Sequence, residues 1–268
     1  MAAEDATHHS ILALDIEGFT QRDNPAQISL HEAVYDIVDA AARDVGIDPD
    51  QIGRADTGDG MLLFFPASIP TATLVGPLLR ALGDRLAEHA KRSSAQYALR
   101  LRISLHHGLA HRGERGWTGD AVNFACRLVD AQPLRDVLTA AVRANLVFIA
   151  SDQVYQAVIR HDYRAADPAT YRAVTFSVKQ LRNIRAWICA PGYPNPPGLP
   201  PDPEEPDAPD EGAPDDRALP APRGAAAARV AGTAAEAVAR NQLNAGTVQG
   251  HQIAEVHVTI QNPGSVRL

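Results

Sequence analysis

The sequence is poor in the residues that mark several common classes of protein. Its 268 residues include two cysteines, Cys126 and Cys189, and neither belongs to a CxxC or Cys/His spacing typical of metal sites. We therefore expect both to be small buried side chains of a protein that works in a reducing compartment. No basic run or basic face indicates a nucleic-acid partner.

Long apolar runs are also missing. The N-terminal residues MAAEDATHHS lack the basic start and the apolar core of a secretory signal peptide. No uncharged stretch approaches the roughly 20 residues that a membrane-spanning helix needs. These absences predict a cytoplasmic protein with no membrane segment.

Proline and acidic residues, by contrast, are concentrated in one segment. Twelve of the 20 prolines lie between Pro191 and Pro222, together with eight Asp and Glu residues and one arginine. Such a segment buries too little apolar surface to offset the entropy of ordering it, so we expect an extended, solvated linker. We accordingly predict a folded domain at 1–190, a linker at 191–223 and a tail at 224–268.

The folded part has the pattern of an α+β domain. Apolar residues at helical spacing predict helices, and short or alternating apolar runs predict strands. The order β-α-β-β-α-β, followed by a further α/β lobe, indicates a ferredoxin-like core with additions. In chain order we expect a strand at 11–16, a helix at 27–45, a hairpin at 52–65, a helix at 71–91, a strand at 97–109, a helix at 120–131, a strand at 146–150, a helix from 151, and strands at 174–178 and 184–189.

Two carboxylates are candidates for a metal site. Asp15 ends the first strand, and Asp59 lies at the tip of the Gly58-Asp59-Gly60 hairpin. Strand ends in one sheet bring acids within about 4 to 6 Å, where divalent cations neutralise their repulsion. Taken alone, these acids favour the simpler alternative that Asp15 caps a turn and Asp59 serves only the hairpin.

Four motifs, in this order, resemble those of class III adenylyl and guanylyl cyclases. They are ILALDIEGFT at 11–20, TGDGMLLFF at 57–65, RISLHHG at 102–108 and GDAVNFACRL at 119–128. By this resemblance, Asp15 and Asp59 hold two Mg²⁺ or Mn²⁺ ions per site, with the carbonyl of Ile16 as a further ligand. The implied reaction converts a nucleoside triphosphate into a 3′,5′-cyclic nucleotide and pyrophosphate.

The resemblance also implies where the triphosphate binds. The amides of Gly18, Phe19 and Thr20 are expected to hold it, since successive N–H groups in a tight turn form an anion-binding concavity. Lys179 lies where the family often has a phosphate-binding lysine, but its neighbours lack the usual glycine. An exposed, solvated lysine is the alternative at that position.

Asn123 and Arg127 lie four residues apart on the predicted helix at 120–131, so both side chains share one face. The resemblance assigns Asn123 to orienting the ribose and Arg127 to the charge on the transferring phosphoryl group. In the family, this pair and the metal aspartates come from opposite protomers. A homodimer with two shared sites is therefore expected.

The chain departs from the family where the base is recognised. Purine cyclases usually have a lysine at the position of Ala55 and an acid or similar polar residue at the position of Gly116. A different base such as a pyrimidine, loose selectivity, or nucleotide binding without turnover would each account for this departure. Asp56 and Trp117 flank the gap and are candidates for alternative contacts.

Three histidines, His106, His107 and His111, suggest a metal site at first sight. Neighbouring residues on a strand face opposite sides, so we expect these histidines to be structural instead.

The tail has two predicted halves. Alanine-rich residues 224–240 predict a short helix. Residues 244–262 are rich in Gly, Gln and β-branched residues and resemble, with departures, the bacterial amyloid-signalling motifs related to the RIP homotypic interaction motif. This resemblance implies β-stacking with a partner protein, and disorder or an added edge strand are the alternatives.

The leading hypothesis is a homodimeric, metal-dependent nucleotide cyclase in intracellular signalling. The alternative is a catalytically impaired, cyclase-like scaffold that senses a nucleotide and signals through its tail.

Overall fold

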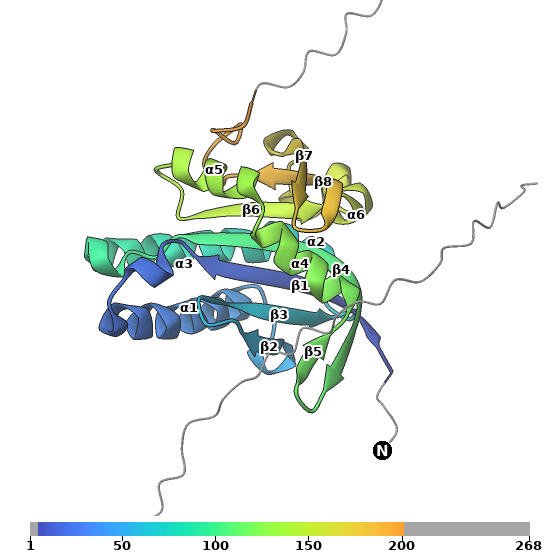
Figure 1. The fold of residues 1–268 in the computed structure, drawn as a ribbon, viewed down its shortest axis with the longest axis horizontal. Coiled ribbons are helices and arrows are strands. Elements are labelled where there is room, and N and C mark those ends of the chain that lie inside the picture. The colour runs from blue at the N-terminus through green and yellow to red at the C-terminus, as the bar shows by residue number, and fades with distance from the viewer. Residues whose placement is uncertain (1–4, 201–268) are drawn as a thin grey trace, which may run out of the picture. The chain divides into compact units, whose positions relative to one another are not determined.

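The computed structural model describes residues 5–200 of the chain, which form an α+β domain around one mixed sheet (Figure 1). The predicted tail at 224–268 and most of the linker at 191–223 lie outside the described residues, so they stay predictions. The strands are β1 (Thr7–Ile16), β2 (Gly53–Asp56), β3 (Gly60–Pro66), β4 (Leu101–Gly113), β5 (Gly116–Thr118), β6 (Leu146–Ser151), β7 (Arg172–Val178) and β8 (Leu181–Cys189). The helices are α1 (Asn24–Asp44), α2 (Thr71–Thr73), α3 (Leu79–Arg92), α4 (Asp120–Val129), α5 (Gln132–Ala140) and α6 (Asp152–Ala157).

The sheet has the order β2-β3-β1-β4-β6-β8-β7, and β5 extends β4 as a hairpin. The first six main elements, β1-α1-β2-β3-α3-β4, form the predicted ferredoxin-like unit. In it, β1 lies between β3 and β4 and is antiparallel to both. The end of β1, the start of β4 and the turn of the β2–β3 hairpin therefore meet at one place.

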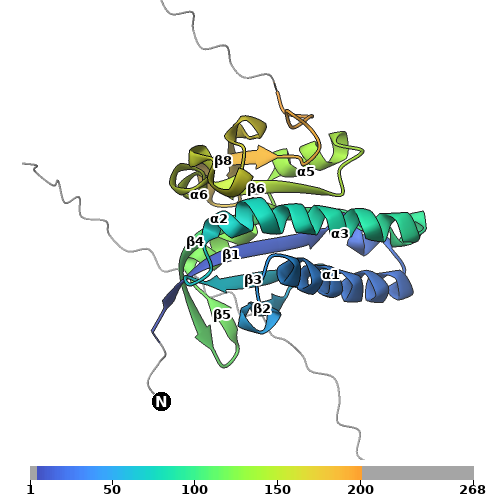
Figure 2. The ribbon, with the colours of Figure 1, turned by 180° about the vertical axis from the view of Figure 1, so that it is seen from behind.

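The sheet is covered on both faces. Figure 1 shows α4 and α5 on one face, and Figure 2, from behind, shows α1 and α3 on the other. Along β1 the side chains alternate, because Leu12, Leu14 and Ile16 pack with α1 and α3 whereas Ile11 and Ala13 pack with α4 and α5. The same alternation directs Asp15 to the α4 face.

Two predicted elements differ from the structure for local reasons. The expected helix at 71–91 is divided into α2, a π-helical turn at Leu74–Leu78, and α3. Pro77 lies inside that turn, and proline has no N–H to continue an α-helical hydrogen-bond ladder. The expected strand at 97–109 begins only at Leu101, because Ala95–Tyr97 form a 3-10 turn.

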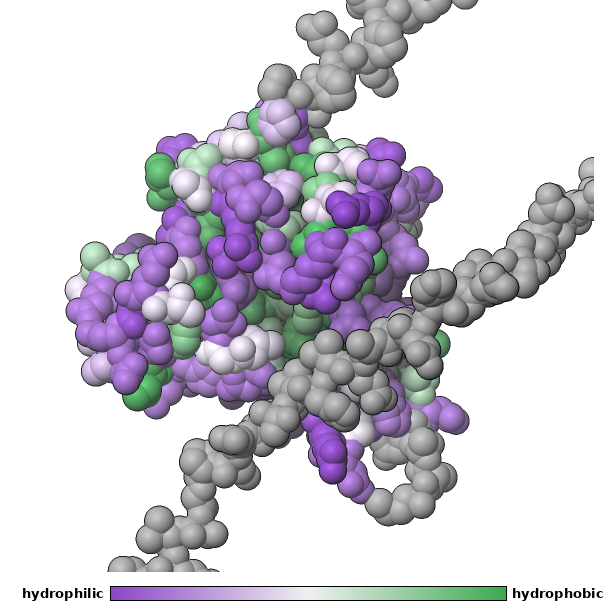
Figure 3. Space-filling model, viewed as in Figure 1, coloured by the Kyte–Doolittle hydropathy of each residue, from purple (hydrophilic) through white to green (hydrophobic). Residues whose placement is uncertain are grey.

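On the face in Figure 3, hydrophilic side chains predominate and hydrophobic ones show in smaller areas between them. Large exposed hydrophobic residues include Ile28 on α1, Leu109 on β4 and Val142 in the segment after α5. None of the helices in residues 5–200 is both long and apolar enough to cross a membrane.

Candidate active site

The strand register places the two predicted metal aspartates next to each other. Asp15 is opposite Gly60 in the β1–β3 pairing, so Asp59 is one residue from that position. The N–H of Ile16 donates a hydrogen bond to the Asp59 carbonyl oxygen at 2.9 Å. A Cβ atom on Gly60 would lie 2.0 Å from the Leu14 carbonyl oxygen, so only glycine permits this approach of the strands.

Asp15 has a further partner, Arg102 of β4, which the sequence patterns did not indicate as a site residue. The two residues are directly opposite in the β1–β4 pairing, and Arg102 Nη2 donates to Asp15 Oδ2. Their side chains are only 14% and 16% exposed. The Nε atom of Arg102 is buried and has no hydrogen-bond partner in the described part of the chain.

The pKa of the Asp15 carboxyl is shifted from its ordinary value. Its pKa is raised from 3.8 to about 6, mainly by burial. The Arg102 guanidinium lowers the pKa, whereas the charges of Asp59 and Asp130 raise it. The site therefore holds carboxylates whose charge is incompletely neutralised, and a divalent cation would relieve this.

The donor set suits Mg²⁺ or Mn²⁺. Within residues 5–200, no group of three or more His, Cys, Asp or Glu side chains is placed to hold a metal. Two carboxylates nevertheless fit Mg²⁺, which is usually bound by one or two carboxylates with waters and substrate phosphates. Ile16, the predicted carbonyl ligand, is the last residue of β1, between Asp15 and the turn that follows.

We expect Asp15→Asn to raise the thermal midpoint of the metal-free protein near about pH 8, and to raise it by a smaller amount near about pH 5, which lies between the unfolded and the folded pKa of Asp15. A pKa of about 6 in the folded state, against 3.8 in the unfolded chain, means that protonated Asp15 contributes stability that is lost as pH rises through about 6. Asparagine imitates the protonated side chain at every pH. Each 1 kcal/mol should appear as about 2 to 4 °C in a domain of this size.

Asp44→Asn is the control for this pH series. The hydrogen bond from Arg85 lowers the pKa of the exposed Asp44, so this carboxyl titrates below the range of the experiment. The difference between Asp44→Asn and wild type should stay constant across the series. A constant difference for Asp15→Asn as well would contradict the raised pKa.

The turn after β1 presents free backbone amides. Gly18 has φ 65°, which favours glycine, and it begins a 3-10 turn at Phe19–Gln21. Within residues 5–200, the N–H groups of Gly18, Phe19 and Thr20 donate no hydrogen bond, whereas the next two amides bond back to Gly18 and Phe19. Three successive unpaired amides form the kind of concavity that binds a phosphate.

A cavity of about 790 Å³ opens beside this turn. Its walls include Gly18 from the turn, Arg102 from β4 and Arg22 from the segment before α1. Gly18 and two arginines thus line the same space, together with the acidic residues Glu17 and Asp23. The two arginines of this cavity are candidates for contacts with a polyanion such as a triphosphate, because guanidinium groups bind phosphates well.

Asn123 and Arg127 are both on α4, as predicted. Asn123 is exposed and Arg127 is half-buried. Ser104 Oγ fixes the helix by donating to the Ala125 carbonyl at 2.8 Å. A Cβ on Gly108 would lie 2.7 Å from Ala121 Cβ, so glycine is needed where α4 crosses β4.

Within residues 5–200, no hydrogen bond or ion pair joins Asn123 or Arg127 to Asp15 or Asp59. One chain therefore does not bring all four predicted catalytic positions into direct contact.

Lys179 lies in the tight turn between β7 and β8, with φ 52°. Its Nζ is 3.6 Å from Asp130 Oδ2 at the end of α4, and the lysine side chain is 54% exposed. Asp130 also influences the pKa of Asp15, so the end of α4 lies within electrostatic range of the candidate metal site. Lys179 is thus partly exposed, but it is ion-paired rather than simply solvated.

The region where the family reads the base is apolar and aromatic in this chain. Trp117 stacks on Phe64, with ring centroids 3.9 Å apart and planes 6° apart. A Cβ on Gly53 would lie 2.4 Å from the Trp117 ring, so glycine makes room for the indole. Ala55, two residues further along β2, packs with the same cluster. The indole is next to a charged group, Arg112 of β4, whose guanidinium carbon lies 5.8 Å from the centroid of the Trp117 ring.

Asp56, one of the two flanking candidates for base contacts, already has several partners. Its Oδ2 is 2.8 Å from His31 Nε2 and 3.4 Å from the Tyr35 hydroxyl. Its Oδ1 accepts the Gly58 N–H at 2.6 Å. Asp56 therefore stabilises the hairpin turn and its contact with α1.

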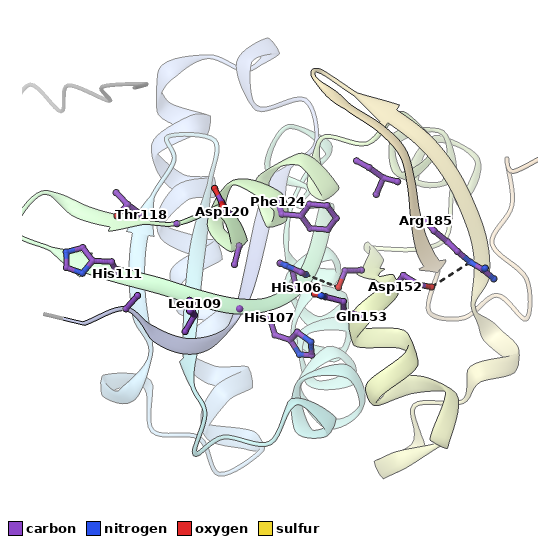
Figure 4. Close-up of a pocket in the computed structure, with 16 residues that line it drawn as sticks. His106, His107, Leu109, His111, Thr118, Asp120, Phe124, Asp152, Gln153 and Arg185 are labelled. Atoms are coloured by element: carbon purple, nitrogen blue, oxygen red, sulfur yellow. Dashed lines mark hydrogen bonds and ion pairs between the residues drawn. The ribbon is translucent and has the colours of Figure 1, made fainter. Parts of the chain in front are cut away.

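The histidines of β4 are near a separate cavity of about 790 Å³ at the other end of the strand (Figure 4). His106 Nδ1 is 3.0 Å from Ser151 Oγ, and burial lowers the pKa of His106 to about 4. Ser151 in turn accepts the Val154 N–H and caps α6. His106 is thus a neutral residue that links β4 to α6.

Comparison with solved structures identifies the fold. The catalytic core of a rhodopsin-guanylyl cyclase with converted specificity is 19% identical, with a TM-score of 0.50 over 70% of this chain and 98% of that one. The guanylate cyclase domain of RhGC from Catenaria anguillulae is 18% identical (TM-score 0.49, 70% and 98% covered), and an adenylate/guanylate cyclase/hydrolase from Silicibacter pomeroyi is 22% identical (TM-score 0.48, 71% and 100% covered).

No protein-family model and no curated protein matches the chain. The predicted fold class is confirmed, because the described domain has the α+β fold of a nucleotide cyclase catalytic core. Identities of this size show the fold alone.

Proposed function

We propose that this chain is a nucleotide cyclase that converts a nucleoside triphosphate into a 3′,5′-cyclic nucleotide and pyrophosphate. The observation that carries the proposal is the placement of Asp15 and Asp59 by the strand register next to the turn at Gly18 with its unpaired amides. The fold supports it, since the similar rhodopsin-guanylyl cyclase core was crystallised in complex with ATPαS.

In the proposed site, Asp15, Asp59 and the Ile16 carbonyl would hold two Mg²⁺ or Mn²⁺ ions. Such ions lower the pKa of an attacking hydroxyl and stabilise a leaving pyrophosphate. The amides of the Gly18 turn bind the triphosphate and hold its α-phosphorus in line with the ribose 3′-hydroxyl.

We further propose that Asn123 and Arg127 act on the nucleotide held by a second copy of the chain. Asn123 orients the ribose, and the Arg127 guanidinium stabilises charge on the transferring phosphoryl group. Their position on α4, with no link to the aspartates of the same chain, is consistent with a shared site in a homodimer. Lys179 binds a substrate phosphate if its ammonium group leaves Asp130 when the nucleotide binds.

The second candidate function is a nucleotide-sensing scaffold with little or no turnover. The observation that favours it is the wall of Trp117, Phe64 and Ala55, which is apolar where purine cyclases usually have the lysine that reads the base. In this alternative, residues 244–262 would transmit the signal by β-stacking with a partner protein.

The two candidates differ in turnover and agree on binding. Both expect nucleoside triphosphate with Mn²⁺ to raise the thermal midpoint of the wild-type protein by the linkage of binding to folding. Only the cyclase expects pyrophosphate release under the same conditions. Stabilisation without pyrophosphate would favour the scaffold, and neither effect would contradict both candidates.

A further inference from the structure

The Asp15–Arg102 pair sits where the proposed metal has to bind. Arg102 Nη2 donates a hydrogen bond to Asp15 Oδ2, so one oxygen of the proposed metal-binding carboxylate already has a hydrogen-bond partner. The pair is largely buried, and the charge of the guanidinium is in direct contact with the carboxylate. A divalent cation bound to the same carboxylate would be strongly repelled by that charge.

Arg100, the residue just before β4, is an arginine whose side chain is fixed by several hydrogen bonds. Arg100 donates to Glu17 Oε2 at 2.8 Å and to the backbone carbonyls of Leu138, Ala141 and Ala144 at 2.5, 3.1 and 3.0 Å. These four acceptors on three segments tie the guanidinium of Arg100 to the domain.

Arg102 is held quite differently. Among residues 5–200, the side chain of Arg102 makes a single hydrogen bond, the one to Asp15. The buried Nε of Arg102 has no acceptor there. Leaving a buried donor without an acceptor is unfavourable, so a position in which Arg102 Nε finds an acceptor would satisfy the side chain better. Arg102 also lines the cavity beside Gly18, which gives the guanidinium a place to move.

We infer that Arg102 is a positioning residue that acts as the counter-ion of Asp15 in the metal-free protein and gives up this carboxylate when the metal binds. The inference rests on the proposed metal site at Asp15. Loading of the site is then an exchange in which Asp15 replaces its guanidinium partner by a divalent cation. Arg102 thereby lowers the affinity for free metal and limits occupation of the empty site.

The test is binding of Mn²⁺ alone to the full-length protein, measured by electron paramagnetic resonance and calorimetry without nucleotide. Arg102→Gln should bind Mn²⁺ about tenfold more tightly than wild type, because the competing cation is gone; this factor corresponds to about 1.4 kcal/mol. Arg85→Gln is the matched control. This substitution also removes an arginine that pairs with an aspartate, in this case Asp44. Arg85 lies on α3, away from the candidate site.

A measurement on the unaltered protein covers the case in which Arg102→Gln does not fold. In ¹⁵N spectra of the arginine Nε–H groups, saturating Mg²⁺ should shift the Arg102 signal and leave that of Arg85 unchanged. An unmoved Arg102 signal in protein shown to bind Mg²⁺ would overturn the inference.

The outcomes separate the inference from the proposed function. Equal or weaker Mn²⁺ affinity in folded Arg102→Gln would overturn the counter-ion role and leave the metal site intact. No Mn²⁺ binding by either protein would overturn the metal site at Asp15, and with it both proposals.

Discussion

Asp15→Asn and Asp59→Asn are each expected to lower the rate of cyclic nucleotide formation at least about 1,000-fold, since a single remaining carboxylate holds the cations poorly and several kcal/mol of transition-state stabilisation are lost. The rate is measured with saturating Mn²⁺ and quantified as cyclic product and pyrophosphate. Folding of each variant is checked by its thermal midpoint without metal.

Asp84→Asn is the control for the loss of one acidic side chain. Asp84 is exposed on α3 and makes no hydrogen bond or ion pair with other described residues. Its substitution should leave the rate within about twofold of wild type, as is usual for exposed sites. Activity within a few fold of wild type in either site variant would rule out the assignment of that aspartate.

The second large effect is recovery of activity from two inactive proteins. If each site takes Asp59 from one protomer and Arg127 from the other, a mixture of Asp59→Asn and Arg127→Gln should regain activity. Random pairing gives about half heterodimers, each with one intact site of two, so recovery should approach about one quarter of the wild-type rate.

Two controls make this experiment decisive. Each variant mixed with itself should stay inactive, and subunit exchange should be followed independently by native mass spectrometry of isotope-labelled protein. A further control is a double variant with Asp59→Asn and Arg127→Gln in the same chain. Its heterodimers with wild type contain no intact site, so the mixture should show only the activity of the remaining wild-type homodimers. Exchange without recovery would exclude the shared site.

The sequence was sufficient to predict elements with long or regular patterns. The apolar run before Asp15 and the Asp-Gly turn at Asp59 predicted β1 and the β2–β3 hairpin, and both are confirmed. Helical spacing predicted α1 and α4 within a few residues of their bounds. The ferredoxin-like order followed from these elements, because their connections leave few ways to form one sheet.

Shorter elements were harder to predict. β5 has three residues and α5 has nine, and both lie between stronger patterns. The break at Pro77 depends on how the helix end packs, which periodicity alone does not report.

The site was predicted in part, for a related reason. Asp15 and Asp59 are recognisable from their turns, but their closeness depends on the opposite pairing of Asp15 and Gly60. Arg102 was missed because its contact with Asp15 depends on the pairing of two strands whose facing residues are 87 positions apart in the chain. The roles of Asp15, Asp59, Asn123, Arg127 and Lys179 stay predictions.

The most direct test of the central claim is an assay of the wild-type protein with Mn²⁺ and, separately, ATP, GTP, CTP and UTP. Products are separated by chromatography and identified by mass, with Asp59→Asn and metal-free samples as controls. The account predicts that at least one nucleotide yields equal amounts of its 3′,5′-cyclic form and pyrophosphate, in a reaction lost in both controls. No cyclic product from any of the four, in protein that Mn²⁺ and nucleotide stabilise, would contradict it.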